Sequence, residues 1–270
     1  MPDGHDADGQ ERALRREIER LGDVVVAFSG GADSALLAWI ANDALGPGRA
    51  RAVTAVSPSL APEEHADCEA LAREWGLDWT AVTTDELADP AYSANDGRRC
   101  FHCKSALMDA LEPLKAGATV VLGVNLDDLG DHRPGQDAAA ARGAVFPFVT
   151  VGMTKADVRG LSSALGLRTW DKPAAACLAS RVPYGTPVTL GTLRSVAAAE
   201  SGLKAMGFAA LRVRHYGELA RIEVPDADFE DVIRRRAAVV ETVHAAGYHY
   251  VTLDLEGLRS GNLNHSLSEG

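Results

Sequence analysis

The residues best suited to chemistry in the first part of the chain are Ser29 to Ser34, which read SGGADS. An apolar, β-branched run at Val24–Val26 precedes them, and apolar residues recur at helical spacing over residues 35–40. This pattern predicts a strand, a glycine-rich turn and a helix. Because glycine lets the backbone come close to a ligand and the free amides at a helix start attract anions, we expect the turn to bind phosphate.

This segment lacks the residues that define two common kinds of nucleotide-binding loop. No Gly-Lys-Ser or Gly-Lys-Thr follows the glycines at the Walker spacing, and there is no G-x-G-x-x-G fingerprint. The turn therefore fits neither a P-loop that transfers the γ-phosphate nor a dinucleotide site. An ordinary glycine-rich turn between a strand and a helix is the alternative that the residues leave open.

Cysteine thiols are the second group of residues able to do chemistry. The four cysteines are Cys68, Cys100, Cys103 and Cys177. The N-terminal residues are polar and acidic, unlike a signal peptide, so we expect a cytoplasmic protein with reduced thiols. Cys68 falls in a helical pattern beside Leu71, which predicts a buried apolar role. The Cys100-x-x-Cys103 pair on its own also fits a redox pair or half of a zinc site.

Cys177 has a different setting, the non-periodic segment 168–185 with its two prolines. A cysteine in such a segment is not a core residue by default. Arg181 follows it within the segment, and a nearby cation favours the thiolate, the form in which cysteine reacts or binds a metal. We therefore expect Cys177 to be accessible and reactive, with Arg181 close to it.

The composition limits the partners of the chain. A formal net charge of −11 argues against binding to nucleic acid or to an anionic membrane surface. No apolar run approaches membrane-spanning length. An anionic ligand must then be met by local arginines. We expect a small-molecule substrate, neither a nucleic-acid nor a membrane partner, and a homo-oligomer.

Strand and helix patterns alternate through the first part of the chain. After a disordered leader at residues 1–10 and a helix at 11–21, strands are expected at 24–26, 52–56, 77–82, 119–123 and 145–149. Helices are expected at 62–75, 105–114 and 155–165, the last opened by a capping box at Thr154 and Asp157. The alternation predicts an α/β fold with a doubly wound parallel sheet and right-handed crossovers.

Two loops of this part have an unusual composition. Residues 83–99 form a long polar loop that runs into the Cys100 pair, and residues 124–135 form a loop rich in acids after the strand at 119–123. Ligands of doubly wound sheets bind at the carboxyl ends of the strands. We therefore expect Gly123, Asn125 and Asp127 on the same rim as the SGGADS turn.

Beyond Pro187 the pattern changes. A helix is expected at residues 190–206, strands at 211–215 and 219–224, a helix at 228–246 and a strand at 248–255. This order predicts a smaller C-terminal α+β domain. We place the boundary near residues 183–187, which gives a first domain of residues 11–185 and a second of residues 186–270.

Four charged residues of the second domain are candidates for substrate binding. Arg212 and Arg214 alternate along a strand, so both point to one face, and their forked guanidinium groups suit a ligand with phosphate and carboxylate groups. Glu200 and Glu223 are expected as neighbours of a cation. The alternative for each of the four is a surface charge without such a role.

Five stretches of the chain carry a family resemblance, and they read SGGADS, RRCFHCK, GVNLDDLGDHRPG, WDKPAAACLASRVPYGT and YVTLDLEGLRSGNLN. Together they resemble the LarE family of ATP-dependent sulfur transferases, within the PP-loop ATP pyrophosphatase superfamily, over nearly the whole chain. SGGADS alone indicates only a PP-loop. The cysteine segment and the acidic loop indicate the subfamily.

The resemblance implies an enzyme that cleaves ATP between the α and β phosphates and adenylates carboxylates of a pyridinium dicarboxylate mononucleotide. A sulfur nucleophile then displaces AMP and leaves a thiocarboxylate, in the biosynthesis of the nickel-pincer cofactor of lactate racemase. Adenylation suits the chemistry because a carboxylate is a poor electrophile and needs a leaving group.

The same resemblance assigns roles to the residues of the rim. Ser29, Ser34 and the amides of Gly30 and Gly31 would hold the pyrophosphate, and Asp33 would lie near Mg²⁺. From their place on the rim, Gly123 and Asp127 are also expected to contribute to binding ATP, and Asn125 to positioning the nucleotide or the substrate. Asp33, Cys177 and Arg181 would act in catalysis.

Members of the family differ in the source of the sulfur. Some give up the sulfur of the central cysteine and are left with dehydroalanine, whereas others use three cysteines to hold a 4Fe-4S cluster that binds an extra sulfide from a donor. This chain has Cys100, Cys103 and Cys177, so the resemblance implies the cluster type, with one iron left free for the sulfide. A sacrificial Cys177 stays open as the alternative.

Other functions compatible with these motifs belong to different classes. A tRNA-thiolating enzyme would share the PP-loop and the cysteines, but the net charge of −11 argues against it. An amide-forming synthetase would need ammonia, and nothing in the sequence marks a glutaminase domain. A nucleotide-binding iron-sulfur sensor without turnover would explain the loop and the cysteines equally well.

Overall fold

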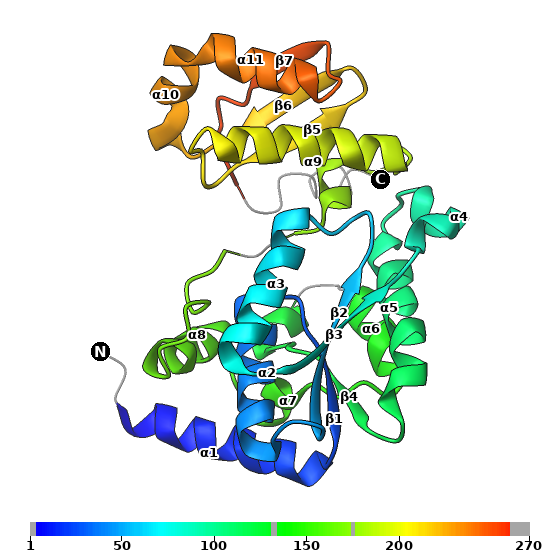
Figure 1. Ribbon diagram of the computed structural model, residues 1–270, viewed down its shortest axis with the longest axis vertical. Coiled ribbons are helices and arrows are strands. Elements are labelled where there is room, and N and C mark those ends of the chain that lie inside the picture. Colours follow the sequence, from blue (N-terminus) through cyan, green and yellow to red (C-terminus); the bar gives the residue numbers. More distant parts are fainter. Residues whose placement is uncertain (1–3, 131–133, 174–175, 260–270) are drawn as a thin grey trace. The chain divides into compact units, whose positions relative to one another are not determined.

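The computed structural model describes residues 4–130, 134–173 and 176–259, and Figure 1 labels its elements. The chain forms two compact units. The first comprises Met1–Ser57, Pro62–Glu86 and Cys100–Ala175, and the second comprises Pro58–Ala61, Leu87–Arg99 and Ala176–Gly270. Each unit therefore combines segments that are distant in the sequence.

The first unit is built on a parallel sheet of four strands. They are β1 (Val24–Ala27), β2 (Ala50–Val56), β3 (Asp78–Thr83) and β4 (Thr119–Val121), in the order β3-β2-β1-β4. Val24 pairs with Ala50 of β2 on one side and with Thr119 of β4 on the other. Because the strand order reverses between β1 and β4, the loops after these two strands flank the crevice where such sheets bind ligands.

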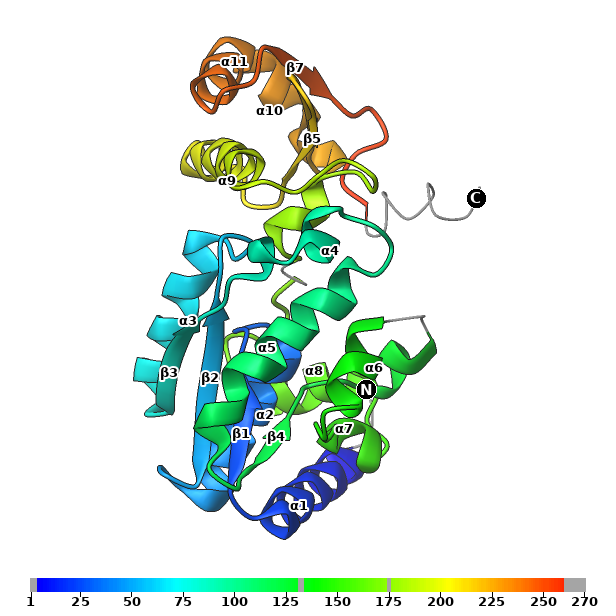
Figure 2. The same cartoon turned by 90° about the vertical axis from the view of Figure 1, so that its right-hand side faces the viewer.

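Helices cover both faces of this sheet (Figure 2). One face packs against α1 (Gly4–Leu21), α2 (Ala32–Leu45), α3 (Pro62–Trp75) and α8 (Lys155–Ala164), and the other against α5 (Arg99–Lys115) and α6 (Pro134–Ala140). Val24 and Val26 belong to the first core and Val25 to the second, because side chains alternate along a strand. The expected doubly wound α/β fold is confirmed.

Helix α1 begins at Gly4, before the expected start at Glu11. Residues 4–10 are thus helical and not part of a disordered leader, whereas residues 1–3 lie outside the described residues. The Arg12 side chain donates to the carbonyl of Asp8 one turn earlier, which links the extension to the expected part of the helix.

The strand expected at residues 145–149 is wrong. Only Val145 forms a parallel bridge, to Val121, and the chain then enters α7 (Pro147–Thr150). Proline has no N–H to donate to a ladder and its fixed φ suits the first turn of a helix, so Pro147 ends the pairing.

The second unit has a three-stranded sheet in the order β5-β6-β7. Its elements are α4 (Pro90–Ser93), α9 (Leu190–Ala205), β5 (Arg212–Tyr216), β6 (Leu219–Glu223), α10 (Phe229–Arg234), α11 (Arg236–Ala245) and β7 (Tyr250–Leu253). Strands β5 and β6 are antiparallel, and β6 and β7 are parallel. Leu203 of α9 and Val243 of α11 pack with Val213 and Ile222 of the sheet. The expected small α+β unit is confirmed, although the helix expected at 228–246 is divided at Arg235.

This unit extends beyond the residues 186–270 that we expected. It begins at Ala176 and includes residues 58–61 and 87–99. Backbone hydrogen bonds explain the difference: Leu178 donates to Ser59, and Gly185 donates to Asn95. Pairing of this kind between distant segments leaves no periodic signal in a sequence.

None of the helices in the described part of the chain is long and apolar enough to cross a bilayer.

Candidate active site

The SGGADS turn connects β1 to α2, as its pattern predicts. Gly31 is the N-cap of α2, and the hydroxyl of Ser34 donates to its carbonyl at 3.2 Å. The Oγ atoms of Ser29 and Ser34 lie 3.0 Å apart, and the amide of Ser29 donates to Ser34 Oγ. The turn therefore gathers two hydroxyls at a helix start, where the helix dipole favours an anion.

Gly30 must be glycine for two independent reasons. Its φ of 69° lies in the left-handed region, and a Cβ there would come within 2.9 Å of the Sγ atom of Cys68. Cys68 is fully buried in α3, as expected, and burial raises the pKa of its thiol to about 11. Cys68 thus packs beneath the turn as a neutral thiol and is unsuited to act as a nucleophile.

Gly123 brings the loop after β4 against the start of α2. A Cβ at this position would lie 2.9 Å from the carbonyl carbon of Asp33 and from the amide nitrogen of Ser34. Only a residue without a side chain permits this approach. Gly123 therefore serves close backbone packing at the rim, where we expected it.

Asp33, in the first turn of α2, joins three segments of the rim. Its Oδ1 accepts from Asn125 Nδ2 at 3.1 Å, and its Oδ2 lies 2.5 Å from Lys155 Nζ. Asp127 accepts the amide of Lys155 at 2.8 Å and donates its own amide to Asn125 Oδ1. The structure thus brings the predicted residues Asp33, Asn125 and Asp127 together and adds Lys155.

Lys155 is a residue that the sequence reasoning missed. It is the first residue of α8, which opens with the expected capping box of Thr154 and Asp157. The capping box was a usable signal for the helix start. It could not indicate that this start lies beside Asp33, because that contact depends on the packing of α2 against α8.

In the second unit, Cys177 precedes a short 3-10 turn, Leu178–Arg181, and is exposed, as expected. Arg181 Nη1 donates to the carbonyls of Ala176 at 2.8 Å and of Cys177 at 3.3 Å. Its other nitrogens form a bidentate pair with Glu200, at 2.8 and 3.1 Å. Arg181 therefore holds the backbone at Cys177.

Arg214 forms a second buried pair of the same kind. Its Nε and Nη2 donate to the two oxygens of Glu223 at 3.0 and 2.9 Å, and its Nη1 donates to the carbonyl of Ser180 at 2.8 Å. Glu200 and Glu223 do neighbour cations, as expected, and these cations are the arginines of the chain itself. Arg214 supports the turn after Cys177 from the sheet.

Arg212 differs from Arg214, although the sequence treats the two alike. Burial lowers the pKa of Arg212, and the charges of Arg214 and Arg181 lower it further. Its Nη1 donates to the carbonyl of Arg259. Among the described residues, Arg221 pairs with Glu223 and Asp254, so the group contains four arginines and the three carboxylates Glu200, Glu223 and Asp254. This excess of positive charge suits an anion.

The polar loop before Cys100 holds the Cys177 segment, a role that the sequence reasoning missed. Asn95 is fully buried at φ 56° and donates to the carbonyls of Pro183 and Thr186, each at 2.8 Å. Arg99 donates to Asn95 Oδ1 and to the carbonyl of Ala179, and its guanidinium lies 5.3 Å from the ring centroid of Tyr184. A buried asparagine in the left-handed region indicates a position fixed by its surroundings.

Cys100 and Cys103 lie in the first turns of α5, because this helix begins at Arg99 and not at Ser105 as expected. Asp96 accounts for the early start, since its side chain and carbonyl accept the amides of Arg98 and Arg99. Cys100 is exposed and Cys103 is half-buried. Among the described residues, no group of three or more His, Cys, Asp or Glu side chains is placed to hold a metal ion.

Cys100 and Cys103 belong to the first unit and Cys177 to the second, and a cluster shared by the three stays a prediction.

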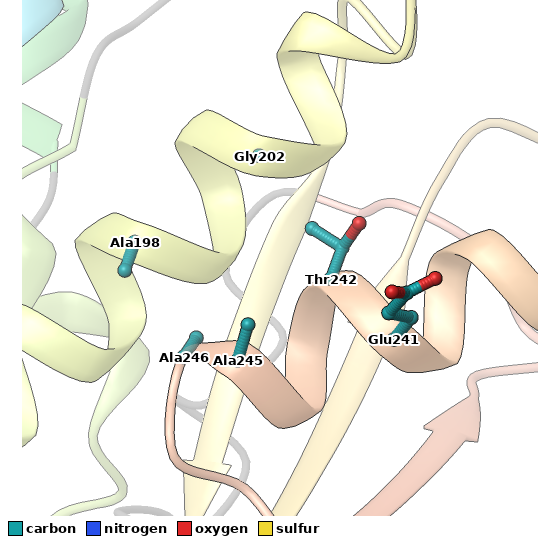
Figure 3. A pocket seen from close by; sticks show the side chains of 6 residues that line it. All are labelled: Ala198, Gly202, Glu241, Thr242, Ala245 and Ala246. Carbon is teal, nitrogen blue, oxygen red and sulfur yellow. The ribbon is translucent and has the colours of Figure 1, made fainter.

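A surface pocket of about 420 Å³ lies between α9 and α11 of the second unit (Figure 3). It is lined by Ala198, Gly202, Glu241, Thr242, Ala245 and Ala246. Its lining includes none of the predicted site residues. We therefore do not assign the pocket to the candidate active site.

Comparison with known proteins identifies similar chains. A family model described as NAD synthase matches residues 10–103. The chain is 44% identical over 261 residues to an uncharacterized protein of Synechocystis sp., covering 95% of this chain and 97% of that protein. It is 36% identical over 260 residues to the pyridinium-3,5-bisthiocarboxylic acid mononucleotide synthase of Lactiplantibacillus plantarum, covering 95% and 93%. An uncharacterized protein of Methanocaldococcus jannaschii is 25% identical over 240 residues, covering 88% and 91%.

Proposed function

The chain belongs to the LarE family of ATP-dependent sulfur transferases, and we propose that it converts carboxylates of a pyridinium dicarboxylate mononucleotide to thiocarboxylates in nickel-pincer cofactor biosynthesis. The observation that carries this proposal is the SGGADS turn, with the hydroxyls of Ser29 and Ser34 gathered at the start of α2. The chain that contains this turn is similar to the Lactiplantibacillus synthase over nearly the whole length of both proteins.

The enzyme uses ATP and Mg²⁺. Mg²⁺ takes one or two carboxylates from a protein and completes its octahedron with phosphate oxygens and waters. Asp33 fits this demand, since its half-buried carboxylate lies beside the phosphate-binding turn with both oxygens turned toward polar groups. When bound, the ion would neutralise negative charge on the pyrophosphate.

The first reaction joins the substrate to AMP. A carboxylate oxygen of the mononucleotide attacks the α-phosphorus of ATP, and the bond from this phosphorus to the bridging oxygen breaks, so that pyrophosphate leaves. The hydroxyls of Ser29 and Ser34 and the amides of Gly30 and Gly31 hold the leaving pyrophosphate. The ammonium group of Lys155 stabilises the negative charge that develops on the pyrophosphate.

The second reaction forms the thiocarboxylate. A sulfur nucleophile attacks the carbonyl carbon of the acyl adenylate, and the carbon–oxygen bond to AMP breaks. Cys177 is the proposed centre of this step, because it is exposed and its backbone is held by Arg181. Arg212 is the proposed contact for the phosphate or the second carboxylate of the mononucleotide, because the positive group around it attracts an anion.

The sulfur is proposed to come through a 4Fe-4S cluster on Cys100, Cys103 and Cys177. The donor set suits such a cluster, since three thiolates can hold it and leave one iron for an exogenous sulfide. Direct use of the Cys177 sulfur, which leaves dehydroalanine, is the competing source.

The proposed function is tested by incubating the anaerobically prepared protein with Mg-ATP, sulfide and the pyridinium dicarboxylate mononucleotide. AMP and pyrophosphate are expected only when the mononucleotide is present. Mass spectrometry should then detect a product in which sulfur has replaced an oxygen of the mononucleotide. Asp33→Ala is the inactive control. ATP that is bound but stays intact under these conditions would favour a nucleotide-binding sensor and overturn the proposal.

A further inference from the structure

Lys172 lies close to the phosphate-binding turn and has no part in the reactions described above. Its Nζ lies 3.2 Å from the carbonyl oxygen of Gly30, 2.8 Å from Glu64 Oε2 and 2.7 Å from Asp67 Oδ2. An ammonium group has three N–H donors, and each has an acceptor here. The side chain is only 18% exposed, so these contacts are largely shielded from water.

The charge of Lys172 is stable in this position. Burial alone would lower its pKa, but hydrogen bonds to Asp67 and Glu64 outweigh burial and raise the pKa. Lys172 therefore remains a cation, and the two carboxylates hold its Nζ at the Gly30 carbonyl.

The contact of Lys172 with the Gly30 carbonyl also affects the orientation of the next amide of the turn, that of Gly31. The carbonyl of Gly30 and the N–H of Gly31 belong to one planar peptide group and point in opposite directions. A peptide between two glycines has little steric preference, so it can rotate unless something holds it. Lys172 holds the carbonyl, and the N–H of Gly31 is thereby directed away from Lys172.

We propose that Lys172 is a positioning residue of the phosphate-binding turn: it holds the Gly30 carbonyl so that the Gly31 amide is presented to pyrophosphate. The inference rests on the proposed function in taking pyrophosphate as the ligand of the turn. Lys172 also lies in the WDKP stretch, part of a segment that carries the family resemblance.

Arg168 offers a matched control in the same group of charges. It pairs with Asp67 at 2.7 Å and with Glu74 at 2.9 Å, and its described hydrogen bonds do not involve Gly30. Arg168→Met and Lys172→Met each remove one cation from Asp67. Only the second removes the contact with the turn.

The test compares binding of Mg-pyrophosphate and of AMP to the full-length protein by titration calorimetry, with thermal unfolding as a check of folding. AMP lacks the β and γ phosphates that the turn is proposed to hold, so we expect its binding not to depend on the Gly31 amide. Lys172→Met is expected to weaken pyrophosphate binding about tenfold or more, because the pyrophosphate loses its hydrogen bond from the Gly31 amide. Binding of AMP should stay unchanged. Arg168→Met should bind both ligands as the wild type does.

Lys172→Arg keeps the charge and the N–H donors, so its affinity for pyrophosphate should lie between those of the wild type and Lys172→Met. If Lys172→Met does not fold, Lys172→Arg carries the test with the same pair of ligands. A folded Lys172→Met with wild-type affinity for pyrophosphate, or an equal loss in Arg168→Met, would overturn the inference. Wild-type protein that binds neither ATP nor pyrophosphate would instead overturn the proposed function.

Discussion

Lys155 Nζ lies 2.5 Å from Asp33 Oδ2, which joins the first residue of α8 to the first turn of α2. The pair is partly buried and lies at the SGGADS turn, which we propose binds phosphate. A carboxylate and an ammonium group in this place can separate when Mg-ATP binds, because the metal ion then neutralises the carboxylate and a phosphate neutralises the ammonium group.

The first prediction concerns Lys155→Met. Removing a charged contact to a phosphate costs about 1.5–3 kcal/mol, so kcat/KM for ATP should fall about tenfold to a hundredfold. AMP formation at varied ATP concentration measures this. Lys115→Met is a suitable control, because Lys115 pairs with Glu112 on one helix, away from the predicted rim residues. An unchanged kcat/KM would show that Lys155 only compensates the charge of Asp33.

The second prediction concerns Asp127, whose carboxylate accepts the amide of Lys155. Asp127→Ala should weaken Mg-ATP binding because the start of α8, and with it Lys155, loses its support. Asp127→Asn keeps an acceptor oxygen and should retain most of the affinity. Titration calorimetry measures both variants. Equal loss in the two would indicate that the charge of Asp127 acts on the ligand directly.

The third prediction separates Arg212 from Arg214. Arg214→Ala removes the bidentate partner of the buried Glu223, which keeps only its contact with Arg221 among the described ion pairs, and should lower the free energy of unfolding by about 1.5–3 kcal/mol. Arg212→Ala should leave the unfolding free energy nearly unchanged and raise the KM for the mononucleotide more than the KM for ATP. Denaturant unfolding and initial rates measure these effects. Equal changes of both KM values in Arg212→Ala would remove Arg212 from the substrate site.

The fourth prediction concerns Gly30→Ala. The new Cβ would meet Cys68 Sγ at 2.9 Å, and the backbone would be strained at φ 69°, so ATP binding and stability should both fall. Gly160→Ala is the control, because nothing lies within 4 Å of its Cβ position in α8 and alanine favours a helix by about 1 kcal/mol. Thermal unfolding should show opposite shifts for the two variants. A stable, fully active Gly30→Ala would contradict this account of the turn.

The fifth prediction distinguishes the two sources of sulfur. With a cluster, anaerobically reconstituted protein should contain iron, absorb visible light and complete several turnovers with sulfide. Serine at Cys100, Cys103 or Cys177 should each abolish this. With sacrificial sulfur, only Cys177→Ser should be inactive, and mass spectrometry after one turnover should show loss of hydrogen sulfide. Multiple turnovers by the double variant lacking Cys100 and Cys103 would exclude the cluster, and full activity of Cys177→Ser would exclude both sources.

Local features of this protein could be predicted from the sequence because neighbouring residues produce them. The run Val24–Val26 before SGGADS determined a strand, a turn and a helix start, and Thr154 with Asp157 determined the start of α8. Alternation of strands and helices determined the parallel sheet, and therefore that the loops after β1 and β4 share one rim. The burial of Cys68 follows from its helical pattern in the same way.

Only the tertiary structure decided which charges meet. Arg212 and Arg214 look equivalent along their strand, but Arg214 is paired with Glu223 and Arg212 lies beside two other arginines. The contacts of Lys155 with Asp33 and of Lys172 with Gly30 join residues that are more than a hundred positions apart. The physical reason is that a periodic pattern records which side of an element is buried, whereas an ion pair depends on where a distant element packs, and no local pattern contains that information.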